Sequence, residues 1–155
     1  MKTYSLKTEQ AIPISLEEAW SFFSSPLNLS KITPAGVNLV VTSDYGADTR
    51  IYAGMIITYI VSPFLGIKMN WMTEIIHIKE GEYFVDEQRF GPYALWHHQH
   101  HFKAIKGGIL MTDILNYAIP YGIIGRLANT LLVDKQIKQI FSYREKAIKE
   151  LFGEF

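Results

Sequence analysis

The sequence predicts an α+β protein in which one antiparallel sheet packs against a long C-terminal helix. Two observations lead to this class. Positions 37 to 118 alternate apolar and polar residues in about six segments separated by turn residues, whereas the chain after Pro120 has helical periodicity up to Phe152. Strands joined by such short turns pair antiparallel, because a parallel connection needs about a dozen residues or more.

The N-terminal part predicts one strand followed by two short helices. The strand covers about Thr3 to Ile12. Ser15 precedes Leu16-Glu17-Glu18, a capping-box pattern that begins an amphipathic helix, and Pro26 and Pro34 bracket a second helix. Together with the later segments, this strand makes a seven-stranded sheet.

The C-terminal segment is about 30 residues long, or about 45 Å as a helix, so it must cross the whole sheet. Its apolar stripe moves by about half a turn along the helix. The two parts of the stripe are Ile124, Leu127, Ala128 and Leu131, and then Val133, Ile137, Ile140, Ile148 and Leu151. Because one straight helix would not keep both parts buried, we predict a break or kink between about Asn129 and Asp134.

Composition favours a single globular domain over residues 1–155. Hydrophobic residues make up 48% and charged residues 19%, and 15 basic residues balance 15 acidic ones. This balance lacks the basic excess that nucleic acid binding needs, so no nucleic acid partner is expected. Without cysteine, thiol catalysis, disulfides and cysteine-ligated zinc are excluded.

Neither a membrane span nor a secretory signal is expected. Ile51 to Ile67 lacks formal charges but is interrupted by Gly54, and Ser62-Pro63-Phe64-Leu65-Gly66 looks like a connection between two strands. The opening MKTYSLKTEQ is charged and has no apolar region behind it, which predicts a cytoplasmic protein.

Alternation along the last two strands indicates which side chains face the interior. Near positions 94 to 104 the face with Trp96, His98, His100 and Phe102 carries no lysine, so we expect it to point inward. The next strand has an apolar face of Ile109, Met111, Leu115, Tyr117 and Ile119 that includes one carboxylate, Asp113. A buried carboxylate must be paired, hydrogen bonded or protonated.

The turn Lys106-Gly107-Gly108 allows two registers for these strands. A Lys106-Gly107 loop places His100 opposite Asp113 and Trp96 opposite Tyr117, and a Gly107-Gly108 loop makes both pairs diagonal. In either case all four side chains share a face. We therefore predict an interaction of Asp113 with His100 that raises the imidazole pKa.

Three earlier strands add to the predicted inner surface. The face with Phe84, Asp86, Gln88 and Phe90 is preferred over the face with Val85, Glu87 and Arg89, which carries two full charges. Trp71 and Tyr59 fall on apolar faces of their strands. The predicted ligand-binding residues are thus Tyr59, Trp71, Asp86, Gln88, Trp96, His98, His100, Phe102, Met111, Asp113 and Tyr117.

This order of elements resembles the START-like helix-grip superfamily, which includes polyketide cyclases, the major birch pollen allergen and SRPBCC ligand-binding proteins. The segments that are similar to the SRPBCC branch are Ser25-Pro26-Leu27-Asn28-Leu29, Ile32-Thr33-Pro34, Phe84-Val85-Asp86-Glu87-Gln88, Gly91-Pro92-Tyr93, Trp96-His97-His98-Gln99-His100-His101-Phe102, Asp113, Tyr117 and Pro120-Tyr121-Gly122. The resemblance covers nearly the whole chain. It implies a hydrophobic cavity between the sheet and the C-terminal helix.

The leading hypothesis is therefore binding of a small hydrophobic molecule: a lipid, an aromatic metabolite or a polyketide-like compound. The alternative is a cyclase-like or dehydratase-like enzyme that uses His98, His100 and Asp113 for proton transfer. No nucleophile, Gly-x-Ser-x-Gly motif or phosphate-binding glycine motif accompanies them.

Two further hypotheses concern metals and partners. His98, His100 and Asp113 would allow metal ligation, but a hydrogen-bonded cluster under the ligand is preferred, and no metal or other cofactor is expected. Tyr52, Ile56 and Ile60 form an apolar stripe on the outer face of their strand, which we expect a helix to cover. Without a covering helix, the stripe would form a dimer or membrane contact, so the protein is either a monomer or a homodimer. A third hypothesis for the function is an interaction module whose outer stripe docks another protein.

Overall fold

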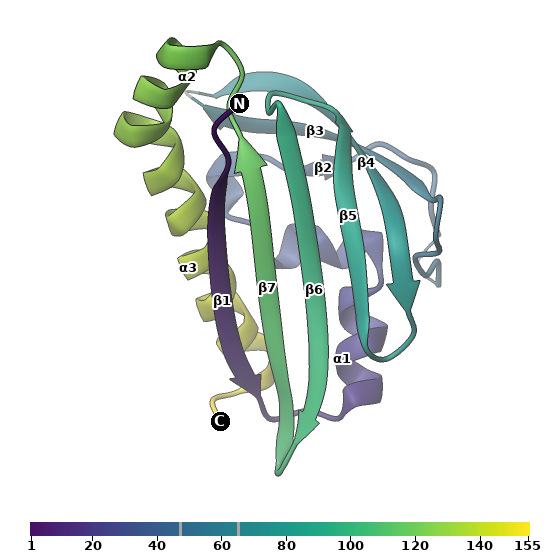
Figure 1. Cartoon of the computed structure of the whole chain (residues 1–155). Coiled ribbons are helices and arrows are strands. Elements are labelled where there is room, and N and C mark those ends of the chain that lie inside the picture. Colours follow the sequence, from purple (N-terminus) through teal and green to yellow (C-terminus); the bar gives the residue numbers. More distant parts are fainter. Residues whose placement is uncertain (47, 65) are drawn as a thin grey trace.

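The computed structural model describes residues 1–46, 48–64 and 66–155 and contains one seven-stranded antiparallel sheet (Figure 1). The strand order is β1-β7-β6-β5-β4-β3-β2, so six consecutive strands form a meander and the first strand pairs with the last. This confirms the predicted fold class. The strands are β1 (Tyr4–Ile12), β2 (Val40–Val41), β3 (Ile56–Phe64), β4 (Ile67–Lys79), β5 (Tyr83–Phe90), β6 (Leu95–Ile105) and β7 (Gly108–Ala118).

Helices cover one face of the sheet. The short helices after β1 are α1 (Leu16–Phe23) and the 3₁₀ turns η1 (Pro26–Ile32) and η2 (Ala35–Val37). The long C-terminal segment consists of α2 (Gly122–Ala128), the π-helical turn η3 (Asn129–Val133) and α3 (Asp134–Phe152). Figure 1 shows α3 running along the same face as α1, so that the sheet curves around both helices.

The predicted capping box begins α1. The backbone N–H of Glu18 donates to Ser15 Oγ over 3.1 Å, and the backbone N–H of Ser15 donates to Glu18 Oε2 over 2.9 Å. Two backbone donors at the start of the helix are thereby satisfied.

The β6–β7 hairpin adopts the first of the two predicted registers. Ile105 pairs with Gly108, so Lys106 and Gly107 form the loop, and Gly107 has the positive φ of 87° that glycine adopts without strain. His100 consequently lies opposite Asp113 and Trp96 lies opposite Tyr117.

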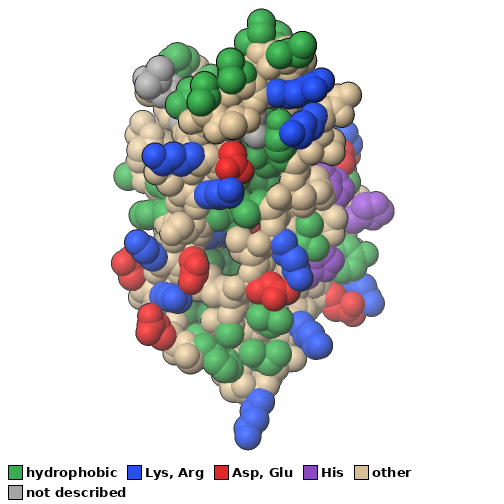
Figure 2. Space-filling model, turned by 60° about the vertical axis from the view of Figure 1, so that its left-hand side comes forward, with side chains coloured by type: hydrophobic (Ala, Val, Ile, Leu, Met, Phe, Trp, Pro, Cys, Tyr) green, Lys and Arg blue, Asp and Glu red, His purple; other side chains and the backbone are tan. Residues whose placement is uncertain are grey.

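The C-terminal segment is interrupted where the shift of its apolar stripe predicted a break. The π-helical turn η3 introduces the phase change: Val133 at its end is buried, as are Ile137 and Ile148 after it. The first part of the stripe, however, is exposed. Figure 2 shows hydrophobic side chains gathered at the α2 end of the molecule, where the exposed ones include Ile123, Ile124, Leu127, Leu131 and Leu132.

Three local expectations differ from the structure. Phe90 was expected to face inward but is 62% exposed, because Arg89 and Phe90 together lie opposite Met72 in a β-bulge that turns Phe90 to the other face. The connection after Ser62 is shorter than predicted: β3 continues to Phe64 and β4 begins at Ile67, while Leu65 lies outside the described residues.

The third difference concerns the outer stripe of β3. Tyr52 is 58% and Ile56 is 39% exposed, so the helix expected to cover them is not present among the described residues. None of the described helices is both long enough and apolar enough to cross a bilayer.

Candidate binding cavity

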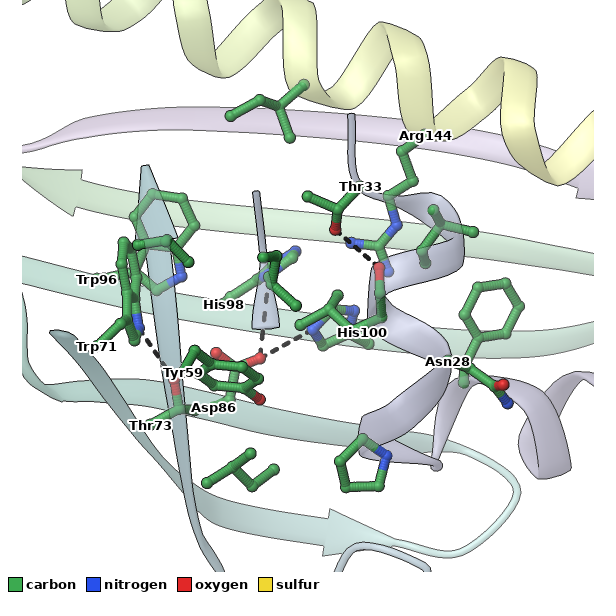
Figure 3. A pocket seen from close by; sticks show the side chains of 18 of the residues that line it. Asn28, Thr33, Tyr59, Trp71, Thr73, Asp86, Trp96, His98, His100 and Arg144 are labelled. Carbon is green, nitrogen blue, oxygen red and sulfur yellow. Dashed lines mark hydrogen bonds and ion pairs between the residues drawn. The ribbon is translucent and has the colours of Figure 1, made fainter. Parts of the chain in front are cut away.

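A cavity of about 200 Å³ lies between the concave face of the sheet, η1 and the middle of α3. Its wall is mainly apolar because the inward residues of β3 and β4 are mostly aliphatic or aromatic. Figure 3 shows Asp86, His98 and His100 close together in this wall, with Arg144 reaching toward the cavity from α3. Apolar residues in the wall include Phe23, Ile32, Ile57, Val61, Ile75 and Phe141.

The structure brings six of the predicted ligand-binding residues into this wall. They are Tyr59 from β3, Trp71 from β4, Asp86 from β5, and Trp96, His98 and His100 from β6. The inward faces predicted for these four strands are therefore the faces that meet the cavity.

The remaining predicted residues lie outside the cavity wall. The side chain of Gln88 holds the β5–β6 turn, since its Nε2 donates to the carbonyl of Tyr93 over 2.8 Å. Phe102 packs between Trp20 and Phe23, with ring centroids 5.8 and 5.5 Å away. Alternation predicts the face of a side chain, but it does not predict which stretch of that face meets a helix.

The inward residues of β7 are separated from the cavity for the same reason. Tyr117 stacks on Tyr4 with ring centroids 5.4 Å apart. Met111 and Asp113 line a second hollow between α3, β1 and β7. Asp113 nevertheless contacts the two histidines of the cavity wall.

Arg144 and Tyr93 line the cavity but were not predicted to do so. Arg144 occupies the buried side of α3 together with Ile137, Phe141 and Ile148. Its spacing of seven residues from Ile137 places it on the apolar stripe, and this was the signal that could have identified it. Tyr93 lies in the turn before β6, where alternation gives no information.

Two carboxylates and two histidines form a cluster behind the polar side of the cavity. His98 Nε2 donates to Asp113 Oδ1 over 3.0 Å, and His100 Nε2 donates to Asp86 Oδ2 over 2.9 Å. Figure 3 shows Asp86 reaching both rings. The two imidazoles lie close together, with centroids 3.8 Å apart.

The predicted contact between Asp113 and His100 is present as an ion pair. His100 Nδ1 lies 2.8 Å from Asp113 Oδ1, but the two atoms are not hydrogen bonded. The close hydrogen bond of Asp113 goes to His98. The geometry therefore places Asp113 between both imidazoles.

The environment separates the acidities of the two histidines. Burial, together with the nearby charge of His100, lowers the pKa of His98. Burial also opposes the charged form of His100, but its contacts with Asp113 and Asp86 outweigh burial and raise its pKa, as the sequence predicted. Two adjacent rings thus differ in proton affinity.

Asp113 is ionised in spite of its burial. Burial opposes the carboxylate, but the Arg144 guanidinium and the two histidines outweigh this effect and hold the pKa of Asp113 well below its usual range. Arg144 Nη1 lies 4.0 Å from Asp113 Oδ1, which is an ionic contact without a hydrogen bond.

The same side chains come close enough to one another to ligate a metal. One potential ligand atom from each of Asp86, His98 and His100 lies within 4.8 Å of the others. Two of these side chains are joined by the hydrogen bond from His100 Nε2 to Asp86, which a metal would have to replace. The preference for a hydrogen-bonded cluster stays a prediction.

Comparison of the fold with solved structures gives matches over the whole chain. A protein of Chromobacterium violaceum is 15% identical, with a TM-score of 0.71 over 98% of this chain and 99% of that one. A protein of Thermus thermophilus is 17% identical, with a TM-score of 0.68 over 95% of each chain.

Plant proteins are among the structural matches. Ginseng major latex-like protein 151 from Panax ginseng is 15% identical, with a TM-score of 0.68 over 97% of each chain. Ara h 8.0201 is 13% identical, with a TM-score of 0.57 over 96% of this chain and 99% of that one. No protein-family model matches the sequence, and the comparison with curated proteins gives no match.

At these identities the similarity concerns the fold alone. The shared features are the meander of strands, the short helices after the first strand and the long C-terminal helix that the sheet surrounds. The chain therefore has a helix-grip fold, which it shares with ginseng major latex-like protein.

Proposed function

We propose that this protein binds a small hydrophobic molecule in the cavity between the sheet and α3. The observation that carries the proposal is the mainly apolar wall of that cavity, which includes a few polar groups. Such a wall is typical of small-molecule sites. It favours a ligand whose body is apolar and whose polar part is small.

The size of the cavity narrows the ligand class. Its volume of about 200 Å³ exceeds the roughly 150 Å³ of a cavity that holds benzene. An aromatic compound of about one ring with substituents fits this space better than a long acyl chain. Among the three predicted classes, the aromatic metabolite is therefore preferred.

The aromatic wall supports an apolar or aromatic ligand. Trp71 and Trp96 pack edge to face with ring centroids 5.1 Å apart, and Trp71 Nε1 donates to Thr73 Oγ1 over 3.0 Å. The indole N–H is therefore satisfied within the wall. Burial raises the pKa of Tyr59 and Tyr93, so both stay neutral phenols.

Native mass spectrometry of the purified protein tests the proposal. We expect an organic adduct that is lost on denaturation and is recovered in a solvent extract. Val61→Phe should reduce the bound fraction because this side chain projects into the cavity, whereas Ile60→Phe on the opposite face of β3 is the matched control. Equal occupancy in both variants would contradict the proposed location.

Acid–base catalysis is the second candidate function, and one observation favours it. His98, with its lowered pKa, can accept a proton beside His100, with its raised pKa, and both rings line the cavity. Incubating the extracted ligand with fresh protein would reveal a product of changed mass. Asp113→Asn should abolish this conversion in an enzyme, and should alter only affinity or stability in a binding protein.

A further inference from the structure

Arg144 brings a cation with unused hydrogen-bonding capacity to the cavity. Its side chain is 11% exposed, and Figure 3 shows it reaching from α3 toward the cavity. Nε is buried and has no hydrogen-bond partner among the described residues. A buried donor left without a partner is costly, and more so in a charged group.

Asp113 does not satisfy this guanidinium. Its Oδ1 accepts the hydrogen bond from His98 and lies 2.8 Å from His100 Nδ1, while Arg144 Nη1 stays at 4.0 Å. The carboxylate oxygen that faces Arg144 is thus already shared between two imidazoles. Another hydrogen-bond acceptor is needed to satisfy the N–H donors of the guanidinium.

Several other donors of the cavity wall are satisfied by the wall itself. Asn28 Nδ2 donates to the carbonyl of Phe22 over 3.0 Å, and Thr33 Oγ1 donates to the carbonyl of Leu29 over 2.7 Å. Trp71 Nε1 is bonded to Thr73. A ligand that enters the cavity therefore meets few unused donors. Two of them are charged: His100 Nδ1, which already lies 2.8 Å from a carboxylate oxygen of Asp113, and Arg144, which has no acceptor that close.

We infer that the ligand is an uncharged, otherwise apolar molecule that presents one carbonyl oxygen to Arg144. This inference rests on the proposed binding function and specifies the polar part of the ligand. The carbonyl oxygen would accept from the guanidinium, and the ring or chain would contact the aromatic wall.

Formal charges favour a neutral oxygen over a carboxylate. Asp86 and Asp113 supply two negative charges, and Arg144 with a protonated His100 supplies at most two positive charges while His98 is neutral. With His98 neutral, the cluster therefore carries no net positive charge. A third carboxylate would enter a buried site without a counter-ion, which is costly.

Three ligands of matched shape test this inference. They are 4-isopropylacetophenone with a carbonyl, 1,4-diisopropylbenzene without an acceptor, and 4-isopropylbenzoate with a carboxylate. Dissociation constants are measured by NMR titration of the ¹⁵N-labelled protein at pH 7.5. We expect the ketone to bind about tenfold more tightly than the hydrocarbon, as for a hydrogen bond to a charged group, and more tightly than the benzoate.

Variants identify the donor. Arg144→Met should remove the preference for the ketone, whereas Tyr59→Phe, which removes another hydroxyl of the wall, should retain it. Arg126→Lys on exposed α2 is the control for a remote arginine. If Arg144→Met does not fold, the wild-type protein still gives an answer, because the Nε–Hε resonance of Arg144 should move downfield with the ketone and not with the hydrocarbon.

The outcomes separate this inference from the proposed function. Equal affinity for ketone and hydrocarbon, an unmoved Nε–Hε resonance, or tightest binding of the benzoate would overturn the carbonyl assignment while the cavity still binds ligands. Loss of the ketone preference in Tyr59→Phe would also overturn it. Failure of all three compounds to bind would contradict both.

Discussion

Asp113 lies directly opposite His100 in the β6–β7 pair, yet its hydrogen bond comes from His98. The second carboxylate repeats this pattern, since Asp86 lies opposite His98 in the β5–β6 pair and accepts from His100. Each carboxylate is thus bonded to the diagonal histidine. The crossed pairs tie three strands together through side chains and fix both imidazoles at the cavity wall.

Asp113 is the member of this cluster whose loss should cost most. Asp113→Asn removes the carboxylate that neutralises Arg144 and His100 in a buried place, so we expect a loss of about 3 kcal/mol in the free energy of unfolding. Urea denaturation at pH 7 measures it. A loss below about 1 kcal/mol would show that the buried charges are screened in another way.

Asp134→Asn is the matched control. Asp134 pairs with Lys138 over 2.7 Å, but their side chains are 42% and 61% exposed. An exposed pair of this kind contributes about 0.5 kcal/mol or less. A large loss in this control would mean that removing any carboxylate near α3 destabilises the protein.

The fold was predictable because alternation and turn residues are local signals. A two-residue loop limited β6 and β7 to two registers, and the structure has the one with Lys106 and Gly107 in the loop, which places His100 opposite Asp113. The actual hydrogen-bond pattern was not predictable, because side chains at diagonal positions also come within reach. A choice between facing and diagonal partners depends on rotamers that the surrounding structure selects.

The contents of the cavity wall were predictable only in part. Strand alternation identified Trp71, Trp96 and His98, whereas Phe102 shares the inward face but is covered by α1. Arg144 was missed because a charged residue is expected on the exposed side of a helix. Its position on the apolar stripe was the stronger signal.

The exposed apolar side chains of α2 and η3 predict self-association at this end of the molecule. Leu127 and Leu131 are 61% and 63% exposed, whereas Ile56 in the outer stripe of β3 is 39% exposed. Sedimentation velocity at increasing concentration should show association that Leu127→Glu reduces. Ile56→Lys should leave the association unchanged. If Ile56→Lys reduces the association and Leu127→Glu does not, the contact is formed by the outer stripe of β3 instead.

The two buried imidazoles should titrate on opposite sides of 6.5, the ordinary pKa of histidine. Burial and the charge of His100 lower the pKa of His98, whereas contacts of His100 with Asp113 and Asp86 outweigh its burial and raise its pKa. NMR titration of the Cε1–H resonances measures both, with His98→Gln and His100→Gln for assignment. A common midpoint for both rings would contradict the separation.

The opposite directions of these shifts predict how stability depends on pH. The contribution of His100 is complete below pH 6.5 and is lost as the pH rises through its raised folded-state pKa. The contribution of His98 is complete above pH 6.5 and is lost as the pH falls through its lowered folded-state pKa.

The two histidines therefore change the free energy of unfolding with pH in opposite directions, so the wild-type value should change little near pH 6.5. His100→Gln should make stability rise more steeply with pH and His98→Gln should make it fall, and urea midpoints from about pH 5.5 to 7.5 measure both slopes. If the free energy of unfolding changes with pH in the same direction in both variants, the raised pKa of His100 and the lowered pKa of His98 are contradicted.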